Sequence, residues 1–155
     1  MADLVSYLVF DVEAIADGEL IAKAKYGDAE MSSGEAIAKF GAERLEQRGN
    51  DVLPPTWMLP ISVAIAKVDS GFRLLDLTVL DAPAYRPHVI TDLFWKGWKH
   101  YSQPTLVTFN GRGYDLPVLN WQPIATGSRC RNGSTLKPGR MTRPGTGTTS
   151  SRTST

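Results

Sequence analysis

The chain has 155 residues, of which 42% are hydrophobic and 21% charged, a composition typical of one globular domain with a single core. The formal net charge of +1 conceals a division, because residues 1–120 hold 11 basic and 16 acidic side chains, while residues 121–155 hold six basic and no acidic ones. The lone Cys130 excludes an internal disulfide, acidic Asp3 argues against a signal peptide, and no apolar run approaches the ~18 residues of a membrane helix, so we expect a cytoplasmic protein without a membrane segment.

The first predicted element is a buried strand over residues 6–10, an apolar and β-branched run with Asp11 and Glu13 at its end. After a glycine turn, residues 19–26 fit either a short helix or a strand that pairs with the first. A Ser-x-x-Glu capping box opens a predicted helix over residues 32–48, which the following glycine ends. We interpret this helix as an insertion on the core of a sheet.

The second half of the chain predicts a hairpin followed by alternating helices and strands. Strands over residues 61–68 and 72–80 flank an Asp-Ser-Gly turn, which favours antiparallel pairing. A helix over residues 89–101, a short buried strand over 105–109 and a helix beginning at 115–119 follow. The order predicts a mixed α/β sheet, which fits a ribonuclease H-like fold without singling that fold out.

The first chemical motif is Phe-Asp-Val-Glu at residues 10–13. Carboxylates at i and i+2 of a strand point to the same face, so Asp11 and Glu13 can converge on one hard cation. Mg²⁺ and Mn²⁺ prefer such oxygen ligands. The alternative is an ordinary polar strand end with two solvated charges, which the motif alone does not exclude.

The second motif runs from Thr108 to Leu119, where a strand enters a Gly-rich turn and Asp115 opens a helix. A carboxylate at a helix N-terminus is stabilised there, so a plain capping role is the alternative. A second strand–turn–acid element in the same small sheet nevertheless favours a common site. Three carboxylates at one edge indicate a two-metal site for phosphoryl transfer.

Together these motifs resemble the first two acidic motifs of DnaQ-like 3′→5′ exonucleases. The longer string Leu-Val-Thr-Phe-Asn-Gly-Arg-Gly-Tyr-Asp-Leu-Pro-Val-Leu resembles the PolB-related predicted 3′→5′ exonuclease family, and the resemblance covers about residues 5–119. It implies a ribonuclease H-like mixed sheet with flanking helices. It also implies hydrolysis of terminal phosphodiester bonds at a single-stranded 3′ end of nucleic acid, with Mg²⁺ or Mn²⁺ as cofactor.

The resemblance also implies a role for each matching residue. Asp11 would bridge both metals, Glu13 would bind the metal that activates water, and Asp115 would hold the second metal, directly or through a water. Asn110 would shape the turn, and the Val12 backbone would lie near the terminal nucleotide. The residues expected to contact nucleic acid are Val12, Asn110, Gly111 and Tyr114.

The family's third motif, a Tyr or His followed by an Asp, has no counterpart, because residues 120–155 contain no Asp, Glu, His or Tyr. This Arg-, Gly-, Pro-, Ser- and Thr-rich segment is typical of disorder, and codon degeneracy permits a shifted frame that reads like a globular domain. We therefore predict a partial exonuclease domain over residues 1–119, incomplete at its C-terminus, and a disordered, out-of-frame tail over 120–155. The two-metal site would be incomplete and turnover impaired. The alternatives are a non-catalytic single-stranded nucleic-acid-binding module and a non-functional fragment.

Overall fold

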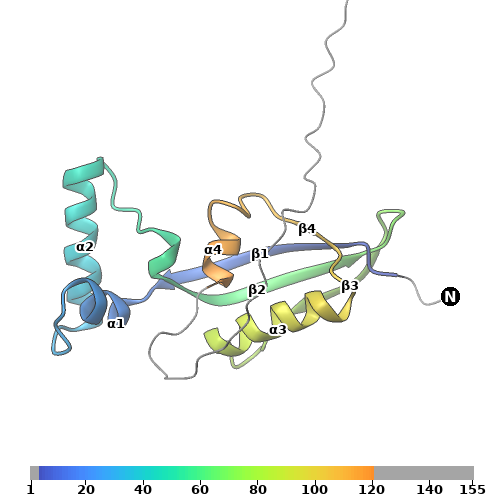
Figure 1. The fold of residues 1–155 in the computed structure, drawn as a ribbon, viewed down its shortest axis with the longest axis horizontal. Coiled ribbons are helices and arrows are strands. Elements are labelled where there is room, and N and C mark those ends of the chain that lie inside the picture. The colour runs from blue at the N-terminus through green and yellow to red at the C-terminus, as the bar shows by residue number, and fades with distance from the viewer. Residues whose placement is uncertain (1–3, 121–155) are drawn as a thin grey trace, which may run out of the picture. The chain divides into compact units, whose positions relative to one another are not determined.

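The computed structural model describes residues 4–120 of the chain (Figure 1). The chain divides into two units, Met1–Pro123 and Ile124–Thr155, and all described residues belong to the first. The interpretation of residues 120–155 as a disordered, out-of-frame tail, and of the fold as incomplete at the C-terminus, therefore falls, apart from Asn120, on residues outside the described range and stays a prediction.

A four-stranded sheet organises the described residues, with the strand order β3-β2-β1-β4. Strands β1 and β2 are antiparallel, as are β2 and β3, whereas β4 runs parallel to β1. This mixed sheet with flanking helices confirms the ribonuclease H-like arrangement expected from the sequence. The strands are β1 (Tyr7–Ala16), β2 (Met58–Val68), β3 (Leu74–Val79) and β4 (Thr105–Val107).

Strand β1 is longer than the sequence predicts. The unbroken apolar run ends at Phe10, yet pairing with β2 continues as far as the pair Ala16↔Met58, because backbone hydrogen bonds do not depend on side-chain polarity. Asp11 and Glu13 therefore lie within the strand and not at its end. A β-bulge follows at the step from Glu13 to Ala14, and such bulges re-aim the side chains beside them.

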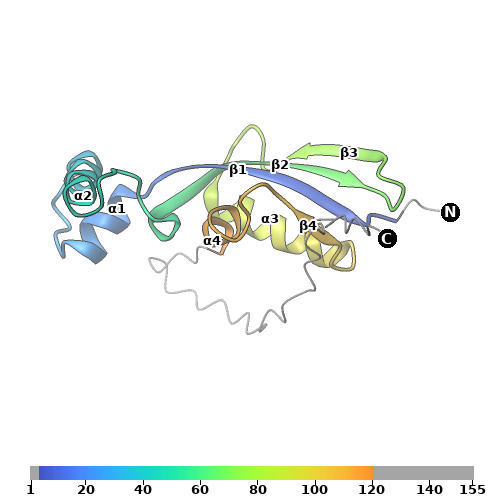
Figure 2. The ribbon, with the colours of Figure 1, turned by 90° about the horizontal axis from the view of Figure 1, so that it is seen from above.

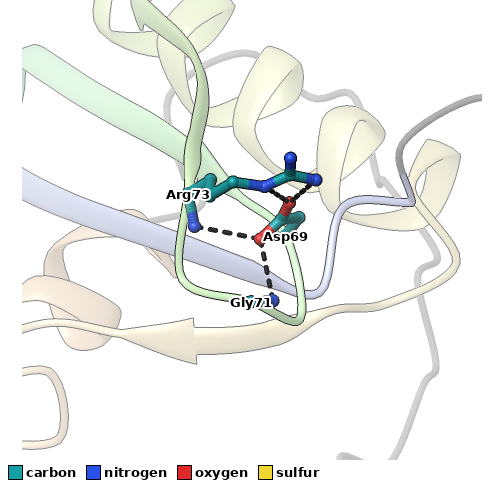
Figure 3. Close-up of polar contacts among 3 residues, drawn as sticks. All are labelled: Asp69, Gly71 and Arg73. Atoms are coloured by element: carbon teal, nitrogen blue, oxygen red, sulfur yellow. Dashed lines mark hydrogen bonds and ion pairs between the residues drawn. The ribbon is translucent and has the colours of Figure 1, made fainter.

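The hairpin turn between β2 and β3 is held by one carboxylate (Figure 3). Asp69 Oδ1 accepts hydrogen bonds from the backbone N–H groups of Gly71 at 2.8 Å and Arg73 at 2.9 Å, and Oδ2 accepts one from Arg73 Nε at 2.7 Å. These bonds, led by that of the Arg73 backbone, lower the pKa of Asp69. The predicted turn is confirmed, but β3 begins two residues later than predicted, because Phe72 adopts a left-handed conformation with φ of 61°.

Two helices cover one face of the sheet (Figure 2). Helix α3 (Pro87–His100) begins with proline at a first-turn position, which suits its fixed φ, and α4 (Asp115–Leu119) follows β4. Trp95 Nε1 donates a 2.9 Å hydrogen bond to the Leu119 carbonyl and so joins the two helices. The core between helices and sheet consists of Leu8, Phe10, Val12, Val63, Ile65, Ile90, Phe94, Val118 and Leu119.

A helical insertion between β1 and β2 has its own small core. It comprises α1 (Gly18–Leu20), the π-helical turn η1 (Ile21–Lys25), α2 (Ser33–Arg48) and the 3₁₀ turn η2 (Pro55–Trp57). The capping box at Ser32 and the left-handed Gly49 confirm the predicted helix boundaries. Residues 19–25 are helical and Tyr26 caps them, so the strand alternative was wrong. The buried residues of this insertion are Ile21, Ala22, Ala36 and Phe40.

None of the helices within residues 4–120 has the length and apolar character needed to cross a membrane.

Candidate metal and nucleic-acid site

Strand β1 presents two carboxylates on its exposed face. Its burial alternates strictly from Leu8 to Glu13, so Asp11 and Glu13 are exposed while the side chain of Val12 between them is buried in the core. Their antiparallel partners on β2 are Ala64 and Ser62, two small residues. Small neighbours leave the space above the sheet open beside both carboxylates.

The turn from β4 to α4 is built by close backbone contacts. The Asn110 carbonyl accepts hydrogen bonds from the N–H groups of Gly113 at 3.0 Å and Tyr114 at 2.9 Å. A Cβ on Gly111 would overlap the methyl group of Thr108, and one on Gly113 would lie 2.6 Å from Asn110 Oδ1. The contact at Gly111 is the more restrictive, because Thr108 is held by its hydrogen bond to Asp115, whereas a Cβ on Gly113 would meet the end of the exposed Asn110 side chain.

Asp115 lies at the start of α4 and is only 4% exposed. Its Oδ2 accepts a 2.8 Å hydrogen bond from Thr108 Oγ1, which ties the first residue of the helix to the end of β4. The bond satisfies part of the hydrogen-bonding capacity of a carboxylate that would otherwise be costly to bury. Asp115 therefore has a structural partner in addition to its predicted role.

Tyr114 connects the two motifs electrostatically. Its ring is half-buried against the core, and this burial raises the pKa of its hydroxyl. The negative charges of Glu13 and Asp115 raise that pKa further. Both carboxylates therefore act on the same phenol, although one belongs to β1 and the other to α4.

The three predicted metal ligands do not form a ready-made cluster. Within residues 4–120, no three side chains of His, Cys, Asp or Glu gather as a metal-binding group. Asp11 and Glu13 lie on the exposed face of β1, and Asp115 is engaged by Thr108. Oxygen donors are nonetheless the type that Mg²⁺ and Mn²⁺ bind, so the exposed pair fits such a cation chemically. Their roles as metal ligands stay a prediction.

The residues expected to contact nucleic acid have unlike environments. Asn110 is exposed, and its side chain approaches the backbone of Gly113. Gly111 is buried and Tyr114 is half-buried. The Val12 side chain belongs to the core, so only its backbone is available for the role that the resemblance implies.

Sequence reasoning included Thr108 and Phe109 in the second motif but predicted no role for either. Both lie in the predicted strand 105–109, but β4 ends at Val107. Thr108 instead donates its hydroxyl hydrogen bond to Asp115, and Phe109 is fully exposed at 103%. The glycines that follow could have indicated an earlier end of the strand, because close turns begin before the glycine that they require.

Comparison with known proteins gives one match. The sequence model of a family described as predicted 3′-5′ exonucleases related to the exonuclease domain of PolB matches residues 50–132, more than half of the chain. No curated protein and no solved structure matches it. The matched residues include β2, β3, α3, β4 and α4 but not β1. Asp11 and Glu13 therefore lie outside the match, on a strand that pairs with the matched strands β2 and β4. The fold, the Asn-Gly-x-x-Tyr-Asp turn and this match together establish that the chain belongs to the predicted 3′-5′ exonucleases related to the exonuclease domain of PolB.

Proposed function

We propose that the edge formed by β1, the β4–α4 turn and α4 is the site of a metal-dependent 3′→5′ exonuclease. Its substrate would be the terminal phosphodiester bond of a single-stranded nucleic acid. The observation that carries the proposal is the parallel pairing of β1 with β4, because it brings the strand of Asp11 and Glu13 beside the strand that leads into the turn before Asp115. Metal-dependent phosphoryl transfer uses carboxylates that come together in this way.

In this proposal Asp11 and Glu13 hold a divalent cation, Mg²⁺ or Mn²⁺, above the exposed face of β1. When bound, such a cation polarises the scissile phosphate and promotes formation of the attacking hydroxide. Asp115 would contribute a further carboxylate, one oxygen of which already accepts the hydrogen bond of Thr108. Asn110 and Gly111 fix the turn, and Tyr114 and the Val12 backbone orient the terminal nucleotide.

The proposed site lacks the residues of the family's third motif within this chain. Residues 120–155 contain no Asp, Glu, His or Tyr, so that segment offers neither a further carboxylate side chain nor a group that orients the attacking water. We therefore infer that this chain, with its exonuclease domain at residues 1–119, binds cation and substrate better than it hydrolyses. Turnover would be impaired because water would have to replace a protein ligand.

A second candidate is a non-catalytic module that binds single-stranded nucleic acid through the same surface. It is favoured by the lack of a three-ligand metal group within residues 4–120. The two candidates share the binding surface and differ only in product formation. A time course of product release therefore separates them.

The test uses the full chain, Mn²⁺ and 5′-labelled single-stranded DNA and RNA. Calorimetry would measure Mn²⁺ binding to the wild type and to Asp11→Asn and Glu13→Gln, with Glu46→Gln as a control, since Glu46 is an exposed acid of the insertion. We expect both site variants, and not the control, to lose Mn²⁺ binding. A ladder of products shortened from the 3′ end supports the exonuclease, and binding without products supports the module. Equal Mn²⁺ binding by all four proteins contradicts the proposed metal site.

A further inference from the structure

Phe109 is the most exposed large apolar residue of the described chain. Its relative exposure is 103%, so the protein buries none of its ring. The tryptophans of residues 4–120 differ in this respect: Trp95 and Trp98 donate hydrogen bonds to backbone carbonyls, and Trp57 packs edge-on against Phe40. A wholly exposed phenylalanine forgoes the favourable transfer of its ring from water, which makes it a feature to be explained.

Phe109 and the two exposed carboxylates follow the same paired position of the sheet. In the parallel pairing of β1 with β4, Val9 lies opposite Val107. Asp11 comes two residues after Val9 within β1, and Phe109 comes two residues after Val107, in the turn that follows the end of β4. Val9 and Val107 are both exposed, which identifies this as the open face of the sheet. The aromatic ring and the carboxylates therefore belong to one neighbourhood.

The turn that carries Phe109 is fixed on both sides. Thr108, the residue before it, donates its hydroxyl hydrogen bond to Asp115, and Asn110, the residue after it, accepts two backbone hydrogen bonds. Gly111 is packed so closely against Thr108 that a Cβ at this position would require the Thr108 side chain to shift. A backbone held in this way presents the exposed ring with little loss of conformational freedom when a ligand binds.

We propose that Phe109 is a stacking platform for a base at the 3′ end of a single-stranded nucleic acid. This inference rests on the proposed function, since it requires that the 3′ end of the nucleic acid bind at the carboxylates of β1. Aromatic side chains stack on any base, because every base has a π-face. Phe109 therefore positions the strand without reading its sequence, and it is a positioning residue separate from the metal ligands.

The experiment measures binding of 5′-fluorescein-labelled dT₁₀ by fluorescence anisotropy, with Ca²⁺ as the only divalent cation. A second oligonucleotide has abasic sites at its last two nucleotides, and a third has them at its first two. The proteins are the full-length wild type, Phe109→Ala, Phe109→Leu and the site variant Glu13→Gln. Phe72→Ala is the matched control, because Phe72 is exposed in the β2–β3 turn and its ring stacks on Tyr7.

We expect Phe109→Ala to weaken binding of intact dT₁₀ by about 5- to 150-fold, the range that loss of one stacked base gives. Phe109→Leu should also weaken it, because leucine keeps apolar volume without an aromatic face. Removal of the 3′ bases should weaken wild-type binding by a similar factor and should not weaken Phe109→Ala further. Phe72→Ala and the oligonucleotide with 5′ abasic sites should behave as the wild type and intact dT₁₀ do.

Two results would overturn the inference. If Phe109→Ala binds intact dT₁₀ as tightly as the wild type while Glu13→Gln loses cation-dependent binding, the stacking role is wrong and the proposed site stands. If the wild type binds none of the oligonucleotides, the stacking role and the proposed function both fall. Thermal melts of each variant check folding, and the exposure of Phe109 predicts unchanged melts.

Discussion

The two faces of the sheet differ in burial, because one packs against α3 and α4 and the other is exposed. Strand β1 contributes alternate residues to both faces. Toward α3 and α4, the strand buries Leu8, Phe10 and Val12 in the main core. On the opposite face it exposes Asp11 and Glu13. Because the side-chain period of a strand is two, stability and the proposed chemistry are interleaved along one segment of sequence but separated in space. The two faces should therefore respond independently to mutation.

The open face is not purely polar. Across the sheet, Val9 of β1 pairs with Ala66 of β2, which pairs with Leu77 of β3, and Leu77 is 65% exposed. A further exposed valine, Val79, lies opposite Ala64 in the row that includes Asp11. The carboxylates are therefore flanked by exposed apolar surface, whereas the covered face is apolar throughout its centre. Both faces therefore carry apolar residues, and what distinguishes the two faces is whether those residues are buried.

The largest effect is expected on the covered face, from Phe94→Ala. Phe94 is 1% exposed and packs edge-on against Phe10 with ring centroids 4.9 Å apart. Removing the ring leaves a cavity between α3 and the sheet, and such truncations cost about 3–5 kcal/mol of unfolding free energy. Urea denaturation followed by circular dichroism measures the loss. A cost below about 1 kcal/mol would show that this face does not form the stabilising core.

The next largest loss of stability is expected in the β4–α4 turn, from Gly111→Ala. A methyl group at Gly111 would overlap the Thr108 side chain, which is held by its bond to Asp115. We expect destabilisation by about 1–3 kcal/mol, the usual cost of overpacking. Gly97→Ala is the control, because nothing lies within 4 Å of a Cβ at that helical position. Equal melting temperatures for the two variants would contradict the close packing of the turn.

How far the sequence predicts these features depends on the range of the interactions involved. The capping box at Ser32 and the turn at Asp69 are predictable because their hydrogen bonds join residues at most four positions apart. The full length of β1 is not, since it depends on pairing with β2 some fifty residues away in the sequence. The carboxylates of the site are recognisable as motifs. That Thr108 engages Asp115, and that Phe109 is left exposed, depends on where β4 ends in three dimensions.

A smaller effect is expected from acid, in the segment between β3 and α3. Asp81 follows β3 and accepts hydrogen bonds from the Arg86 backbone and guanidinium just before α3, which lowers its pKa from 3.8 to about 2. A carboxyl group with a lowered folded-state pKa stabilises the fold above its unfolded pKa and loses that contribution as the pH falls through the folded value. The stability difference between wild type and Asp81→Asn should therefore be constant above about pH 5 and shrink toward pH 2. Urea denaturation across this range measures it, and a difference that does not change with pH would contradict the role of the ion pair.

The smallest effect on stability, and the sharpest test of the comparison, is Asp11→Asn. Asp11 is exposed, and no hydrogen bond or ion pair engages its side chain among the residues that the structure describes. We expect its melting curve to match that of the wild type within about 0.5 kcal/mol, the usual range for surface substitutions. Val12→Ala, one residue along and on the other face, should instead destabilise the chain by about 1–3 kcal/mol through lost burial. If Asp11→Asn cost as much as Val12→Ala, the open face would contribute to the fold itself, and the separation of stability from chemistry along β1 would be wrong.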